Sequence, residues 1–303
     1  MKNLAMKNVF VILSVLMVLA VVPALALAAE WAELAPPNSE GVAMGQLNYV
    51  VRDVQANKRF WICLGAVPGK EEGGQVFLKI HDVVISLTQG APSGNSVGSV
   101  LDHVGFQVPD VHYLRVRMEA LGYKTAVATT GTKPYTIARI AYIDTPDGER
   151  LEFLQDGTVN TDIVFDDGRR TIGKSPRPRM TVPIILHHVH FYVPESSVGE
   201  IKAWYIKHFG GLSSKRWVYE AVDLPGVNIN ISSSPARLAP TKGRALDHIG
   251  FEVKNLEAFC RKLEADGVKL DRPYTREPSG LATAYLTDPW GVSIGLTEGL
   301  GRY

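Results

Sequence analysis

Three histidines occupy the same place in three similar apolar segments. His103 lies in LDHVGFQV, His248 in LDHIGFEV and His188 in LHHVHFYV. Side chains alternate between the two faces of a strand, so His188 and His248 lie on a polar face, opposite apolar residues that pack inward. Neutral imidazoles on neighbouring strands are suitable ligands for a divalent metal of the first transition row. The pattern therefore predicts that His188 and His248 can hold a metal.

The segments around these histidines belong to a longer internal repeat. Leu101–Lys124 aligns with Leu246–Lys269, and Tyr142–Leu154 aligns with Tyr285–Thr297. Each copy has the pattern of a strand, a helix and further strands, and the same order begins at Leu47 and again in the segment of His188. The chain is thus predicted to be an α+β protein of four βαβββ modules, the first paired with the second and the third with the fourth.

The composition excludes some partners. The chain has 303 residues, with 32 basic and 31 acidic side chains, so its net charge is only +1. With so small a net charge, the protein as a whole exerts no electrostatic attraction on nucleic acid or an anionic membrane surface. The expected partner is a small molecule, and the oligomeric state stays open.

The N-terminus has the layout of a secretory signal peptide. Lys2 and Lys7 precede an apolar run, and Ala26-Leu27-Ala28 offers a small-residue cleavage site. We expect residues 1–28 to be removed and the protein to be exported, into a bacterial periplasm or the medium. The alternative is an uncleaved membrane anchor, because a bilayer needs only about 20 apolar residues.

The rest of the chain divides at changes in composition. The expected parts are a flexible lead-in at 29–41, an N-terminal domain at 42–156, a linker rich in Gly and Pro at 157–182, and a C-terminal domain at 183–299. Cys63 and Cys260 fall in predicted helices of different halves. Two cysteines are too few for a disulfide framework, so both are expected to be free thiols.

The modules resemble the vicinal oxygen chelate superfamily, which includes glyoxalase I, extradiol dioxygenases, and fosfomycin- and bleomycin-resistance proteins. The resemblance rests on four modules in register, the histidine on the first strand, and the turns Pro146-Asp147-Gly148 and Pro289-Trp290-Gly291 before the last strands. It implies curved mixed sheets around a cleft, with metal ligands on the first and last strands of the modules.

The resemblance also implies an anionic third ligand on the last strand. In the first half this position is Glu152, but Tyr49 stands where His188 stands in the second half. In the second half the carboxylate position is Gly295. Each half therefore keeps two of the three ligands that the resemblance implies.

We expect a glyoxalase- or dioxygenase-like protein that uses a divalent metal (Fe, Mn or Zn) on a small oxygen-bearing substrate, chelated in the C-terminal cleft. The activity would be that of a lyase or a dioxygenase. The metal ligands expected from this interpretation are His188 and His248, with His103 and Glu152 as a second candidate site. The candidate acid–base or orienting residues are His190, Tyr192, Glu252 and Tyr285.

Two alternatives remain at this point. The chain could be a small-molecule-binding protein without catalysis, which sequesters its ligand as bleomycin-resistance proteins do. Alternatively, the second and third modules could pair, which would bring His103, Glu152 and His188 into one two-histidine, one-carboxylate set.

Overall fold

The computed structural model describes residues 33–127, 138–156, 163–165, 184–216 and 218–302. The predicted signal peptide and most of the predicted linker lie outside these residues. No helix among the described residues is long and apolar enough to cross a membrane.

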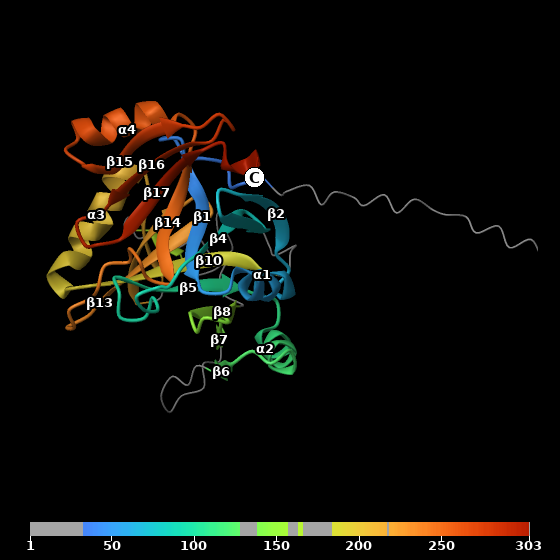
Figure 1. The fold of residues 1–303 in the computed structure, drawn as a ribbon. Coiled ribbons are helices and arrows are strands. Elements are labelled where there is room, and N and C mark those ends of the chain that lie inside the picture. The colour runs from blue at the N-terminus through green and yellow to red at the C-terminus, as the bar shows by residue number, and fades with distance from the viewer. Residues whose placement is uncertain (1–32, 128–137, 157–162, 166–183, 217, 303) are drawn as a thin grey trace, which may run out of the picture. The chain divides into compact units, whose positions relative to one another are not determined.

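Two mixed sheets form the framework (Figure 1). The first, here called sheet 1/4, has the order β15-β16-β17-β14-β1-β4-β3-β2. Its strands are β1 (Val42–Val51), β2 (Val67–Glu72), β3 (Gln75–Ile80), β4 (Val83–Gln89), β14 (Leu246–Val253), β15 (Leu270–Arg276), β16 (Ala282–Thr287) and β17 (Ser293–Glu298). It therefore joins the first module to the fourth.

The second sheet, here called sheet 2/3, has the order β6-β7-β8-β5-β10-β13-β12-β11-β9. Its strands are β5 (Leu101–Gln107), β6 (Thr125–Val127), β7 (Ala138–Asp144), β8 (Arg150–Asp156), β9 (Ile163–Phe165), β10 (Ile185–Val193), β11 (Leu212–Arg216), β12 (Tyr219–Leu224) and β13 (Val227–Ser233). This sheet joins the second module to the third.

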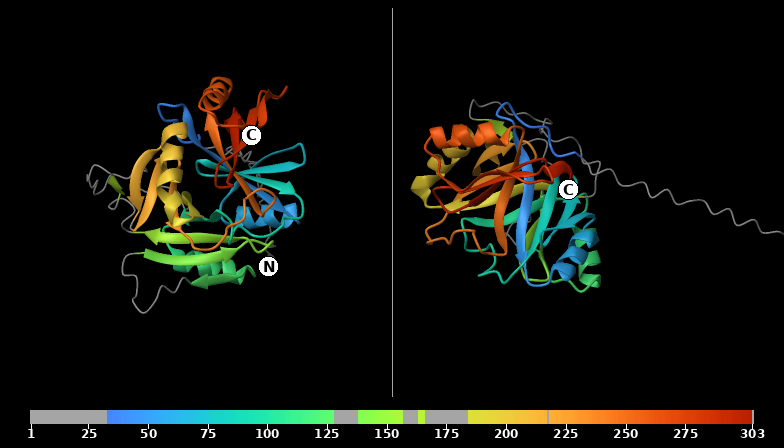
Figure 2. Two further views of the ribbon diagram at one scale, coloured as in Figure 1. Left: turned by 90° about the vertical axis from the view of Figure 1, so that its left-hand side faces the viewer. Right: turned by 45° about the horizontal axis from the view of Figure 1, so that its top comes forward.

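The predicted modules are present, but the predicted pairing of consecutive modules is wrong. The first strands pair antiparallel as β1 with β14 and β5 with β10, so neither sheet is confined to 42–156 or to 183–299. In Figure 2 the blue and orange-red strands share one sheet, and the green and yellow strands share the other. The physical reason is that every module exposes the same first-strand edge. The sequences of such similar modules contain no local signal that determines which first strands pair with each other.

Each module contributes one helix. The helices are α1 (Val54–Cys63), α2 (Val111–Ala120), α3 (Val198–Phe209) and α4 (Leu256–Ala265). Three begin at a side chain that accepts a hydrogen bond from the first turn, namely Asp53, Asp110 and Asn255. Helix α3 ends at Gly210, whose φ of 68° is in the left-handed region that glycine adopts without strain.

Helices α1 and α3 link the two sheets through aromatic contacts. Trp61 on α1 packs edge-on against Phe106 of sheet 2/3, with ring centroids 5.8 Å apart. Phe209 on α3 packs against Phe251 of sheet 1/4 at 4.8 Å. Tyr205 Oη donates a hydrogen bond of 3.0 Å to Asp288, in the turn before β17. The two sheets therefore share one apolar core.

The predicted lead-in and linker contain ordered contacts. Asn38 Nδ2 donates to the carbonyl oxygens of Phe209 and Gly210, so residues before β1 are tied to the end of α3. Inside the predicted linker, β9 pairs antiparallel with β11 at the edge of sheet 2/3. Cys63 and Cys260 are free thiols, as predicted.

Candidate metal centre

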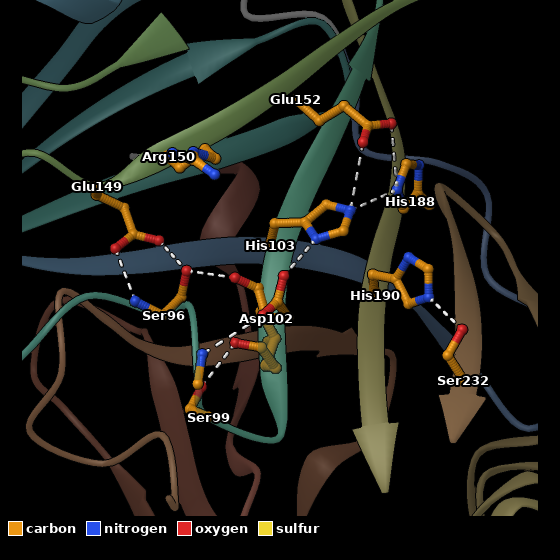
Figure 3. A network of polar contacts seen from close by, with 12 residues as sticks. Ser96, Ser99, Asp102, His103, Glu149, Arg150, Glu152, His188, His190 and Ser232 are labelled. Carbon is orange, nitrogen blue, oxygen red and sulfur yellow. Dashed lines mark hydrogen bonds and ion pairs between the residues drawn. The ribbon is translucent and has the colours of Figure 1, made fainter. Parts of the chain in front are cut away.

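Three neighbouring strands of sheet 2/3 bring the chemically active side chains together. On β5 and β10, His103 lies opposite His190, and Gly105 lies opposite His188. On the other side of β5, Gly105 lies beside Glu152 of β8. The register therefore places two histidines and a carboxylate around one point of the sheet, with a third histidine next to them (Figure 3).

The distances between these groups are those of a metal-ligand set. His103 Nε2 lies 3.5 Å from His188 Nε2 and 3.5 Å from a Glu152 oxygen, and the other Glu152 oxygen lies 3.8 Å from His188 Nε2. Zinc binds imidazole nitrogen at about 2.0–2.1 Å, so tetrahedral ligands stand about 3.4 Å apart. One ring nitrogen of His190 lies within 4.8 Å of a nitrogen on each of the other two histidines. This buried set fits a divalent metal.

Each histidine is held through the nitrogen that is turned away from the shared point. His103 Nδ1 lies 2.8 Å from a carboxylate oxygen of Asp102. His188 Nδ1 lies 2.8 Å from His187 Nδ1. The same arrangement fixes metal-binding histidines in known sites, because the outer hydrogen bond sets the tautomer and the ring orientation. His190 is held in the same way, with its Nε2 2.8 Å from the Ser232 hydroxyl.

The side-chain oxygen of Asn230, next to the cluster, has no hydrogen bond among the described residues. Asn230 lies beside His190 on β13, and its Oδ1 is buried with no hydrogen-bond partner among the described residues. Buried polar atoms are nearly always satisfied. An amide oxygen next to a metal-ligand set would be satisfied by a cation or by a ligand that the cation holds.

Burial disfavours the charged forms of His188, His190 and Glu152. Desolvation lowers the pKa of His188 well below its usual value and that of His190 to about 3. Desolvation also raises the pKa of Glu152, against the opposing effect of His103. Metals bind the neutral form of imidazole. A divalent cation can therefore bind His188 and His190 without first displacing protons from them.

Three tyrosines border the cluster. Tyr142 lies opposite Glu152 on β7 and donates a hydrogen bond to it, and burial raises the pKa of Tyr142 to about 12. Tyr192 stacks on His190 with ring centroids 4.8 Å apart, and Tyr219 meets His190 edge-on at 4.8 Å. Burial also raises the pKa of Tyr192, whose phenol stays neutral near pH 7 and can donate a hydrogen bond to a substrate oxygen, whereas the O–H of Tyr142 already donates to Glu152.

The buried carboxyl of Glu149 supports Asp102 through Ser96. The Ser96 backbone N–H donates to Glu149 at 2.8 Å, and the Ser96 hydroxyl contacts both Glu149 and the backbone oxygen of Asp102. Burial raises the pKa of Glu149 to about 7. Figure 3 shows this chain of contacts from Glu149 through Ser96 and Asp102 to His103. The loop before β5 is thus fixed where it orients the first histidine.

The predicted pair of His188 and His248 does not form a site. His248 lies in sheet 1/4, where it faces Asn48 of β1, whereas His188 lies in sheet 2/3. The pair was expected because consecutive modules were expected to share a sheet. The arrangement that forms instead is the alternative of His103, Glu152 and His188.

The predicted match between Tyr49 and His188 is also wrong. In sheet 1/4, Gly250 lies opposite Gln46, just as Gly105 lies opposite His188 in sheet 2/3. Gln46 is therefore the counterpart of His188. Tyr49 is only 2 % exposed, and its ring lies 5.5 Å from that of Trp61 in the core. Two register shifts in β1 change which of its residues lie opposite β14, so the sequence does not reveal which residue corresponds to His188.

The four predicted acid–base residues divide between the sheets. His190 and Tyr192 lie at the metal centre. Glu252 instead accepts a hydrogen bond from the Gly299 backbone N–H at 2.6 Å and one from the Thr297 hydroxyl at 2.7 Å, so it fixes the C-terminal turn. Tyr285 lies beside His248 in sheet 1/4, with ring centroids 5.5 Å apart.

Sequence reasoning missed the residues that support the centre. An aspartate directly precedes both His103 and His248. This repeated Asp-His dipeptide is a signal that could have identified Asp102. No comparable sequence signal marks Asn230 or Ser232, because only the parallel pairing of β13 with β10 brings them to the cluster.

Comparisons with known proteins agree with this fold. Residues 185–296 match the sequence model of the Glyoxalase/Bleomycin resistance protein/Dioxygenase superfamily. Glyoxalase I from Zea mays is 16 % identical with a TM-score of 0.62, over 86 % of this chain and 93 % of that chain. A protein from Bacillus subtilis proposed to be a dioxygenase is 11 % identical with a TM-score of 0.57, over 88 % of this chain and 86 % of that chain. No curated sequence relative matches the chain.

Residues 185–296 therefore match the superfamily in sequence, as the resemblance implied, and the chain as a whole shares its four-module fold with glyoxalase I. Its histidine cluster lies on the first strands of two paired modules, and its carboxylate lies on a last strand. These are the strands on which the resemblance implied metal ligands.

A glycine at 105 is required for this centre, which gives a direct test. A Cβ at that position would lie 2.1 Å from His188 Cε1, so Gly105→Ala must displace the His188 ring. We expect zinc affinity, measured by competition with a chromophoric chelator, to fall by roughly 10- to 100-fold, the effect of a misplaced ligand.

Gly250→Ala is the matched control. Its Cβ would lie 2.4 Å from Gln46 Cγ in sheet 1/4, a comparable local strain away from the metal centre. Zinc affinity should be unchanged in this variant. Equal losses in both variants would contradict the assignment of the centre to sheet 2/3.

Proposed function

We propose that this protein is a metal-dependent enzyme and that its divalent metal is held by His103, His188 and Glu152. The observation that carries the proposal is the spacing of these three groups, whose facing atoms lie 3.5–3.8 Å apart in a buried part of sheet 2/3. Two neutral imidazoles and one carboxylate form a ligand set that leaves coordination positions open for substrate.

The same geometry supports a substrate class. A bound metal would act as a Lewis acid towards substrate oxygens. Tyr192 can donate a hydrogen bond to one of those oxygens. A small molecule with two adjacent oxygen atoms fits this arrangement, and glyoxalase I shares the fold.

His190 is the proposed acid–base residue. Its Nε2 is engaged by Ser232, and the ring lies next to the two histidine ligands. When Nε2 carries the ring proton and donates to Ser232, Nδ1 of the neutral ring can accept a proton from the substrate. Stacking against Tyr192 fixes the ring orientation.

Metal analysis of single variants tests these roles. Protein purified anaerobically without chelators should carry about one equivalent of iron, manganese or zinc. His188→Ala and Glu152→Gln should lose this metal, whereas His248→Ala should retain it. His190→Gln should also retain it but lose turnover by roughly 100-fold or more, the usual contribution of acid–base catalysis.

Substrate screening with catechols and α-oxo thiol adducts provides the activity for that comparison. Activity should disappear on chelation and return with added metal. A protein that never carries metal, even after reconstitution, would instead support the binding-protein alternative. Loss of metal in His248→Ala but not in His188→Ala would contradict the proposed ligand set.

We also propose that the mature protein is exported. The support is the sequence alone: two lysines, an apolar run and the Ala26-Leu27-Ala28 site. Mass spectrometry of the protein recovered from its native cells should show a chain that begins at Ala29. An intact N-terminus on a membrane-bound protein would favour an anchor.

A further inference from the structure

Sheet 1/4 repeats the layout of the metal centre with different side chains. Gly250 lies opposite Gln46 and beside Gly295, just as Gly105 lies opposite His188 and beside Glu152. His248, Gln46 and Gly295 therefore hold the places of His103, His188 and Glu152. The second set keeps one histidine, replaces the other by an amide and has no carboxylate.

His248 is fixed as its counterpart is, but its other nitrogen has no partner. Its Nδ1 lies 2.7 Å from Asp247, which repeats the contact of His103 with Asp102. His248 is only 6 % exposed, and its Nε2 has no hydrogen-bond partner among the described residues. A buried nitrogen that is oriented and unsatisfied is suited to a ligand.

That nitrogen lies close to position 295, where the metal centre has the residue that carries its carboxylate. A Cβ at position 295 would lie 3.2 Å from His248 Nε2 and 3.5 Å from Gln46 Nε2. In sheet 2/3 the side chain at this place carries a carboxylate, that of Glu152, beside two imidazoles. In sheet 1/4 the two facing groups are present, and position 295 carries no side chain.

The side chains next to His248 are aromatic and cationic. Tyr285 is half-buried, and its ring lies edge-on to His248. The guanidinium of exposed Arg272 lies 3.5 Å above the centre of the Tyr285 ring. An aromatic face with a fixed cation attracts a flat organic anion.

We propose that Gly295 marks a metal-free binding site for the carboxylate of a small aromatic acid. The Gln46 amide donates a hydrogen bond to one carboxylate oxygen. His248 Nε2 and the acid share one proton, as imidazolium with carboxylate or as imidazole with carboxylic acid. The ring of the acid lies towards Tyr285 and Arg272. This site is separate from the proposed metal centre and does not depend on it.

Benzoate is a suitable probe, with neutral benzamide as its matched control. The titration uses the full chain with the His188→Ala substitution, so that metal in sheet 2/3 does not bind the probe; chelator-treated wild-type protein serves if that variant fails to fold. Nitrogen-15-labelled histidine gives a site-specific signal, which His248→Gln assigns. Benzoate should shift the His248 signal saturably, and benzamide should not.

Gly295→Glu tests the location, because its own carboxylate would occupy the proposed site. Benzoate affinity should fall at least tenfold in this variant. Gly301→Glu adds the same charge where nothing lies within 4 Å, and it should bind as the parent protein does. The inference is wrong if benzoate leaves the His248 signal unchanged, or if Gly295→Glu binds benzoate as tightly as its control.

Discussion

The antiparallel pairing of β5 with β10 is the contact on which the candidate site depends. It places Gly105 opposite His188, and the absence of a side chain at Gly105 lets the His188 ring lie across β5. The parallel pairing of β5 with β8 then brings Glu152 to the same point. A shift of one residue in β10 would turn His188 and His190 towards the core, and a shift of one residue in β8 would turn Glu152 towards it.

Burying polar groups at the centre of a sheet is unfavourable unless each is satisfied. The outer nitrogens of the histidines meet Asp102, His187 and Ser232, and Tyr142 donates to Glu152. The inner nitrogens and the carboxylate face one another, where only a cation or shared protons can satisfy them. The folded protein thus keeps a set of groups whose burial a divalent metal would make favourable.

The sequence alone predicted the modules, their strands and helices, and the polar face that carries each histidine. Those features depend on the alternation of polar and apolar residues within each segment and on the internal repeat. The choice of partner sheet was not predictable in this way, because all four modules present similar edges. The mismatch of Tyr49 with His188 had a related cause, since the register shifts in β1 appear only when its partner strand is known.

The correction changes the functional interpretation. With consecutive modules paired, each half had two of three ligands and Gly295 appeared as a defect. With the observed pairing, one sheet holds a complete ligand set and the other holds its altered copy. The two sheets share a core through α1 and α3. One chain thereby offers two places of the same geometry and different chemistry.

The most direct test of the central claim is the location of a bound metal. Crystals grown with manganese or zinc, measured at the metal's absorption edge, show its position without reference to activity. If the metal binds in sheet 2/3, one strong anomalous peak lies between His103, His188 and Glu152. A peak beside His248 and Gln46 instead, or none at all in crystals of metal-loaded protein, would contradict the central claim.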